Sequence, residues 1–264
     1  MFVLGTLKEF FLGLFQYREY LKQSIIRELR KKYKRSILGY LWSMLQPLFM
    51  MIILAMVFSE IMKSDVKNYA VFLFCAMLPW GFFEHSSMQC LSIIRVNARI
   101  IEQLPVPKFI FPLSAVLYNL VNFFLTLVPL ILVMLITNHP FTWKLALFPF
   151  MLVPLFCFTL GISMLLSVLN IFFDDTQHLT QVLLRALYFL CPIIYGKEHI
   201  PVSLLKWVSL NPLFPILEGM RSIIYSGAVP NLADYCYSLW TSLLILLLGL
   251  LAYKKASDKF IYFI

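Results

Sequence analysis

Residues 109–137 decide the fold, and they read FIFPLSAVLYNLVNFFLTLVPLILVMLIT. These 29 residues carry no charged side chain, and the next charge along the chain is Lys144. A helix crosses the hydrocarbon core of a bilayer with about 20 predominantly apolar residues, so this stretch is long enough to span one. The composition agrees, because 61% of the 264 residues are hydrophobic and 13% are charged, against about 45–50% and about 25% in a soluble domain. An ordinary soluble enzyme and a disordered chain are both excluded.

Apolar stretches of similar length lie on both sides of residues 109–137. We predict an all-helical integral membrane protein, a single domain over residues 1–264, that crosses the bilayer six times. Both termini then lie on one side. The other five predicted spans are 37–59, 69 to about 94, 145–173, about 179 to 195, and 235–253.

The distribution of Lys and Arg predicts the orientation. If the N-terminus is cytoplasmic, the cytoplasmic segments hold 15 Lys and Arg and the outer segments hold six. This asymmetry is typical of the positive-inside rule, so we expect a multi-pass membrane protein with both termini on the cytoplasmic side. The net charge of +9 is thereby explained without nucleic-acid binding, for which no folded basic domain remains. No cleavable leader is expected, because Lys8 and Glu9 interrupt the apolar start and no small-residue cleavage site follows.

Two segments are neither spans nor ordinary loops. In residues 9–34 apolar side chains recur every three or four residues among basic ones, which predicts an amphipathic helix at the membrane interface. Residues 197–231 are too rich in proline and polar groups to span, yet too apolar for a solvated loop. We predict two short helices there, joined near Asn211 and Pro212. They would dip into the outer leaflet and return.

Catalytic and metal-binding motifs are absent from the sequence. It contains no GxxxxGK[ST] phosphate loop, HExxH, GxSxG or GxGxxG. The five cysteines and four histidines lie singly, so neither a metal site nor a disulfide framework is predicted. Asp174 and Asp175 are interpreted as caps of the following helix. Glu84 and Arg185 lie within spans and are either structural pairs or transport residues, and the sequence leaves both readings open.

An ordered set of motifs resembles the membrane subunits of bacterial ABC polysaccharide exporters, the type-two permeases that move O-antigen, capsular polysaccharide or teichoic acid. The set covers nearly the whole chain. One position departs from it: the family usually has Arg-Asp where this chain has Asp174 and Asp175, so an ion pair made by that arginine is in question here. The matching motifs are RKKYKRSILGYLW at 30–42 with QPL at 46–48, PWGFF at 79–83, NARIIEQLPVPKFIFP at 97–112, CPIIY at 191–195 and NP at 211–212.

This resemblance implies a homodimer with two copies of a separate ABC ATPase, which would bind the ATP and Mg that this chain has no motif for. The helix over residues 9–34 would rest on the ATPase, and residues 97–104 would form the coupling helix docked in it. The implied ATPase-coupling residues are Asn97, Arg99, Ile100, Glu102, Gln103, Leu104 and Asp175.

The resemblance also implies a substrate, a lipid-linked polysaccharide taken from the cytoplasmic leaflet and moved outward. Flat ring faces stack on sugars, so we expect Tyr40, Trp42, Phe72, Trp80 and Phe82 along the glycan path. A basic cluster would receive the anionic lipid headgroup: Arg30, Lys31, Lys32, Lys34 and Arg35. The helices at 201–225 would form an outer gate with Asn211, Pro212 and Arg221.

Three alternatives stay open on the sequence alone. One is an ABC exporter of a drug or lipid, and another is a membrane-embedded enzyme that processes glycolipids. The third is a proton-coupled carrier that uses Glu84 and Arg185. An adjacent gene for an ATPase, beside genes for glycosyltransferases, would favour polysaccharide export.

Overall fold

The computed structural model describes residues 2–34, 36–61, 66–103 and 106–263, and every regular element in these ranges is helical, as predicted. The elements are, in chain order, α1 (Phe2–Gln16), α2 (Arg18–Tyr33), α3 (Leu41–Met56), η1 (Val57–Ile61), α4 (Tyr69–Leu91), α5 (Ile93–Val96), α6 (Ala98–Gln103), α7 (Ile110–Ile136), η2 (Trp143–Leu147), α8 (Phe148–Phe172), α9 (Thr176–Leu190), η3 (Lys197–His199), α10 (Val202–Val208), α11 (Leu213–Ile224), α12 (Leu232–Ala256) and η4 (Ser257–Tyr262).

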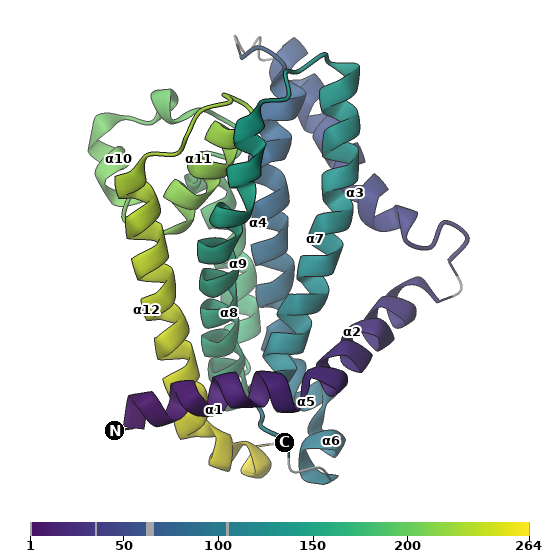
Figure 1. The fold of residues 1–264 in the computed structure, drawn as a ribbon, viewed down its shortest axis with the longest axis vertical. Helices are drawn as coiled ribbons and strands as arrows, with labels where there is room; N and C mark the ends of the chain where they lie inside the picture. The colour runs from purple at the N-terminus through teal and green to yellow at the C-terminus, as the bar shows by residue number, and fades with distance from the viewer. Residues whose placement is uncertain (1, 35, 62–65, 104–105, 264) are drawn as a thin grey trace.

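Within the residues that the structure describes, four segments are long and apolar enough to cross a membrane, and they correspond to the first, third, fourth and sixth predicted spans. In Figure 1, α7, α8 and α12 run along the long axis of a helical bundle, and both termini lie at the same end of it. The four segments are Leu41–Ser59, Ile110–Ile136, Trp143–Phe172 and Leu232–Phe260.

The first of these helices begins at Leu41, four residues later than predicted. Residues 36–40 form a turn instead, in which the backbone N–H of Gly39 donates to Ser36 Oγ at 3.1 Å. Gly39 has φ of +50°, a left-handed conformation that glycine adopts without the steric penalty of a Cβ. The turn separates α3 from the basic helix α2.

The helices at the second and fifth predicted spans, α4 and α9, fall outside this apolar group. α4 has 17 of its 23 residues buried, so protein rather than lipid surrounds most of it, although Glu84 and His85 in its polar second half are not buried. α9 has 15 residues, a length of about 22 Å, which is shorter than a hydrocarbon core of about 30 Å. It ends at Leu190 rather than at residue 195, because Cys191 is extended ahead of Pro192.

Two glycines bring α8 and α12 into close contact. A Cβ on Gly161 would lie 2.6 Å from the backbone nitrogen of Leu246, and one on Gly249 would lie 2.7 Å from the carbonyl oxygen of Gly161. Small residues allow helix backbones to approach this closely in membrane proteins. The α8–α12 pair therefore depends on the absence of side chains at these two positions.

At the end of the bundle with the termini, α1 lies across the long helices and α2 slants away from it (Figure 1). The prediction of one continuous helix over residues 9–34 is wrong in two respects. The helix starts at Phe2, and it breaks at Tyr17, whose φ of −104° and ψ of 18° are not helical.

Candidate functional site

Arg221 of α11 is the one buried Lys, Arg, Asp or Glu among the described residues, with 4% of its surface exposed. Its Nη1 lies 2.5 Å from Glu218 Oε1, and its Nη2 donates to the carbonyl oxygens of Pro192 and Ile193 at 2.5 and 3.0 Å. The guanidinium carbon lies 4.0 Å from the centre of the Phe72 ring, a cation–π contact that is strongest away from water. Arg221 thus joins α11 to α4 and to the loop after α9.

Burial perturbs both charged groups of this cluster. It raises the pKa of the Glu218 carboxyl, and the neighbouring Arg221 opposes that rise. It lowers the pKa of the Arg221 guanidinium, which Glu218 opposes in turn. Each charge therefore favours the ionised form of the other in this enclosed place.

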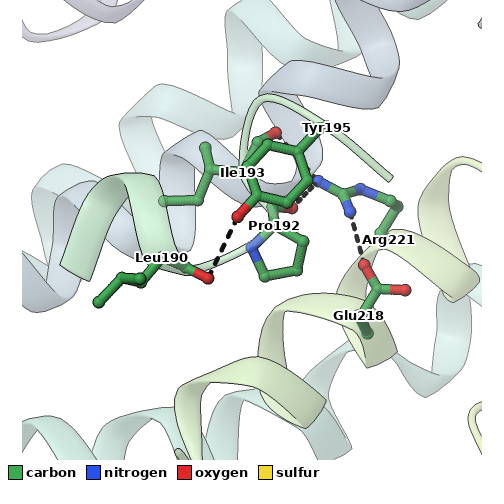
Figure 2. Close-up of polar contacts among 6 residues, drawn as sticks. All are labelled: Leu190, Pro192, Ile193, Tyr195, Glu218 and Arg221. Carbon is green, nitrogen blue, oxygen red and sulfur yellow. Dashed lines mark hydrogen bonds and ion pairs between the residues drawn. The ribbon is translucent and has the colours of Figure 1, made fainter. Parts of the chain in front are cut away.

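The loop 191–195 is held by hydrogen bonds from three sides. Besides the two bonds from Arg221, the hydroxyl of Tyr69 on α4 donates to the carbonyl oxygen of Ile194 at 2.6 Å. Tyr195 folds back, and its hydroxyl donates to the carbonyl oxygens of Phe189 at 2.7 Å and of Leu190 at 3.3 Å; Figure 2 shows the second of these contacts. The last carbonyls of a helix have no partner within the helix, so these bonds also close the end of α9.

The two other predicted gate residues lie at the start of α11. The side-chain oxygen of Asn211 accepts a hydrogen bond from the backbone N–H of Leu213 at 3.1 Å, and its nitrogen approaches Cys191 Sγ at 3.5 Å. Pro212 occupies the N-cap position of α11. Arg221 and Asn211 therefore contact loop 191–195, whereas Pro212 stands at the start of α11. The two short helices predicted in this region are present as α10 and α11, on either side of residues 209–212.

A cleft with an empty volume of about 900 Å³ opens between α3, α4 and α7, with Tyr188 of α9 at its margin. We name it the α3–α7 cleft. It combines apolar and aromatic walls with several hydrogen-bonding side chains, which are Ser43, Gln46, Glu84, His85, Asn119, Asn122 and Thr126.

The five aromatic residues predicted along a glycan path fall into separate environments. Tyr40 and Trp42 are exposed, each with 47% of its surface accessible. Trp80 and Phe82 are buried but form part of the wall of the α3–α7 cleft. Phe72 is buried beneath the Arg221 guanidinium and lies outside the lining of that cleft. The structure therefore does not bring all five rings to one surface of the protomer.

Glu84 and Arg185 also differ in environment. Glu84 lies in the cleft and accepts a hydrogen bond from Trp80 Nε1 at 3.1 Å. Arg185 lies on the exposed side of α9, and the described residues contain no ion pair between it and Glu84. Trp80 lies about one turn from Glu84 on α4, and Tyr188 lies about one turn from Arg185 on α9. The rings of Trp80 and Tyr188 are 5.8 Å apart. Glu84 and Arg185 therefore occupy similar depths on the neighbouring helices α4 and α9.

The basic cluster predicted for a lipid headgroup lies on α2 and just after it. Arg30, Lys31 and Lys34 are exposed. Lys32 belongs to the helix, and Arg35 lies outside the described residues. The exposed members carry like charges on a helix that leaves the bundle (Figure 1), an arrangement suited to anionic partners.

The predicted coupling segment forms the short helix α6, which protrudes from the bundle at the end with the termini (Figure 1). Asn97 precedes it and donates from Nδ2 to the carbonyl oxygen of Ile93 at 2.7 Å, so this residue shapes the segment rather than facing outward. Ile100 is half-buried, and Leu104 lies outside the described residues. Arg99, Glu102 and Gln103 are exposed.

The adjacent carboxylates Asp174 and Asp175 do not cap α9 as predicted. Asp175 occupies the N-cap position, but its side chain makes no capping hydrogen bond. Asp174 instead forms an ion pair with Arg95 of α5, whose guanidinium also donates to the carbonyl oxygen of Asn170 at 3.1 Å. The segment before the coupling helix is thereby joined to the turn between α8 and α9.

Several of these contacts were not predicted from the sequence. Arg95 and Tyr69 acquire their roles only through neighbours distant along the chain, whereas Glu218 stands three residues before its partner Arg221. Asn119 and Asn122 gave a local signal, because they stand one turn apart in the uncharged stretch 109–137. No group of three or more potential metal ligands occurs within the described ranges.

Comparison with known families identifies the class of this helical bundle. The family model described as ABC-2 type transporter matches residues 19–225, which contain the cleft, the coupling segment and α11. The chain belongs to the ABC-2 type transporter family. Together with the four apolar helices, this makes it a membrane permease.

Relatives within the family are named as export permeases. The chain is 31% identical to the O-antigen export system permease protein RfbA of Myxococcus xanthus, over 83% of this chain and 85% of the relative. It is 29% identical to the protein of the same name from Klebsiella pneumoniae, over 89% and 90%. It is 24% identical to the polysialic acid transport protein KpsM of Escherichia coli, over 88% and 92%.

Proposed function

We propose that this chain is the membrane subunit of an ATP-driven exporter that moves a lipid-linked polysaccharide outward across the bacterial cytoplasmic membrane. It would act as a homodimer with two ATPase subunits, with both termini cytoplasmic and six spans in all. The names of its relatives support the substrate class. The observation on this chain that carries the proposal is the α3–α7 cleft.

The chemistry of the cleft favours a glycan over an apolar cargo. Hydroxyl-rich sugars need hydrogen-bonding partners and also stack on aromatic faces. Asn119, Asn122 and Thr126 provide polar groups along one side of α7, and Trp80 and Phe123 provide aromatic ones. A cleft for a drug or an acyl chain would have less use for these polar side chains, because an apolar cargo makes no hydrogen bonds with them.

The loop 191–195 and helices α10 and α11 would form the outer gate. Arg221 supports this role, because a buried charge with several partners holds one arrangement of the gate firmly. To open the gate, the hydrogen bonds from Arg221 to the loop would have to break and be replaced by others. At the opposite end, α6 would dock on the ATPase that binds ATP and Mg.

Movement of the ATPase would reach the bundle through α6. Exposed Arg99 and Glu102 supply groups for docking, and the Arg95–Asp174 ion pair joins this region to the turn before α9. A short helix tied in this way transmits a rigid-body displacement. The exposed basic residues of α2 would receive the anionic headgroup of the carrier lipid.

The experiment is deletion of the gene, followed by complementation with cleft variants. We expect deletion to remove a polysaccharide from the cell surface and to leave its lipid-linked form on the cytoplasmic side. Asn122→Leu with Thr126→Val should abolish rescue, whereas Phe124→Leu on the exposed side of α7 should restore export. Membrane levels of each variant are measured by immunoblot.

Two results would overturn the proposal. Unchanged surface polysaccharide in the deletion strain, with loss of drug or lipid export, would favour the other class of cargo. Transport by the purified chain in vesicles without an ATPase would exclude the ABC mechanism and support a proton-coupled carrier.

A further inference from the structure

A second cleft lies beside α1 and the end of α12. Figure 1 shows these two helices meeting at the end of the bundle that carries both termini. The cleft has an empty volume of about 950 Å³ and is enclosed by α1, residues 107–109 and the end of α12. We name it the α1–α12 cleft. Unlike the α3–α7 cleft, it contains two lysines. Its polar and charged lining is Thr6, Glu9, Gln16, Tyr17, Lys108, Tyr253, Lys254 and Ser257.

Contacts on two sides hold α1 against the bundle and leave this cleft between them. On one side the ring of Phe10 lies 5.3 Å from that of Phe109, and a Cβ on Gly13 would lie 2.7 Å from the same Phe109 ring. On the other side Glu9 pairs with Lys254 at 2.8 Å. The walls of the cleft are therefore fixed by apolar packing and by one ion pair.

The charges in the cleft do not balance. Glu9 compensates Lys254, but Lys108 donates to a neutral group, the carbonyl oxygen of Ser257. Within the described part of the chain, Lys108 has no carboxylate partner. Its ammonium also lies 5.8 Å from the centre of the Phe260 ring, so it is held in place beside apolar surface. A positioned cation with no counter-charge favours an anionic ligand.

We propose that the α1–α12 cleft binds the phosphate headgroup of an anionic membrane phospholipid, with Lys108 and Lys254 as its cationic ligands. The cleft lies where a helix that crosses the bundle end meets the end of an apolar spanning helix, which is the depth of lipid phosphates. Basic pockets between membrane helices on the cytoplasmic side bind such headgroups. Exposed Leu12 beside the cleft provides apolar surface for an acyl chain. The bound lipid would hold α1 on the bundle, whichever substrate the exporter carries.

The test is a titration of the purified full-length protein in detergent, with bound lipid counted by native mass spectrometry. The probes are phosphatidylglycerol, phosphatidylcholine and inorganic phosphate. We expect phosphatidylglycerol to bind preferentially. Lys108→Gln and Lys254→Gln should each weaken this binding about five-fold, the effect of one basic residue near an anionic surface. Glu9→Gln should strengthen it, because Lys254 then loses its competing partner.

Lys255→Gln is the matched control, because Lys255 follows Lys254 on α12 but lies outside the cleft lining. It should leave the affinity unchanged. Equal weakening by Lys255→Gln, or equal binding of the two phospholipids, would overturn the proposal in favour of nonspecific attraction. If inorganic phosphate binds and the same variants change its affinity in the same way, the ligand of the cleft is a free anion and the lipid proposal is overturned. The elution volume and the melting temperature show whether each variant is folded. If a lysine variant does not fold, Glu9→Gln still tests the proposal.

Discussion

At the scale of single residues, Arg221 has the most demanding environment. A buried ion pair is costly to break from one side, because the remaining charge is left without compensation, at about 3–5 kcal/mol. We expect Arg221→Met to lower the free energy of unfolding by about this amount, measured by denaturant titration in detergent. Arg221→Lys should recover only part of the loss, because an ammonium lacks the planar group that contacts both carbonyls and Phe72.

The partner of Arg221 provides the critical comparison. Glu218→Gln in the Arg221→Met background should restore stability in part, since it removes the charge left unpaired. Lys206→Met, on the exposed side of α10, serves as the control and should have little effect. Additive losses in the double variant would contradict the pairing of the two side chains.

The ion pair between Arg95 and Asp174 should behave differently, because both side chains are exposed, at 41% and 80%. Exposed pairs contribute at most about 1 kcal/mol. We expect Asp174→Arg to lower the melting temperature slightly, and Arg95→Asp in the same chain to restore it in part. The restoration is incomplete because the shorter, acidic side chain at position 95 cannot donate the hydrogen bond that Arg95 makes to the carbonyl of Asn170. A double-mutant cycle on the melting temperatures measures the coupling between the two side chains. A coupling of zero would contradict the ion pair.

At the scale of elements, the glycine contact between α8 and α12 makes a firm prediction. A side chain on Gly249 would meet backbone atoms of α8, which have no rotamer by which to move aside. We expect Gly249→Leu to prevent a stable fold and Gly249→Ala to cost about 1–3 kcal/mol, the usual range for overpacking. The yield of monodisperse protein and the melting temperature measure the effect.

A glycine in open space is the control for that experiment. A Cβ on Gly5 of α1 would have no neighbour within 4 Å, so Gly5→Ala should leave the yield unchanged. If Gly249→Leu were also tolerated, the helices would not pack as closely as the structure has them.

Elements could be predicted from the sequence where length and hydropathy decide them. Residues 109–137 are long and uncharged, so the predicted span matches helix α7 almost to the residue. The break at Tyr17 was not predicted, because the amphipathic periodicity continues through it. The early end of α9 was not predicted either, because the apolar composition continues through Pro192. The neighbours of each side chain on α4 could not be predicted from the hydropathy pattern, because the helix is apolar on nearly every side. The sequence therefore did not indicate which residues Trp80 and Phe72 would contact. Contacts such as that of Arg95 with Asp174 depend on tertiary placement alone.

At the scale of the whole molecule, α9 presents a surface that lipid would not favour. Its exposed side carries His178 and Arg185, and polar and charged groups facing hydrocarbon are costly. α3 is also little covered by the rest of the chain, because only 11% of the residues in its most apolar stretch are buried. We predict that a second copy of the chain covers this side, whereas the exposed leucines of α12 face lipid.

Cysteine cross-linking tests which side is covered. In a Cys236→Ser background, which removes the exposed native thiol, Ala186→Cys on α9 should form a cross-linked dimer in native membranes. Leu244→Cys on the exposed side of α12 should remain monomeric, because a lipid-facing position has no fixed partner. Cross-linking at residue 244 without cross-linking at 186 would place the interface on the opposite side. The result matters for export, because Glu84 and the α3–α7 cleft lie next to α3 and α9. If the second copy meets the chain there, the two clefts face each other and can enclose one path.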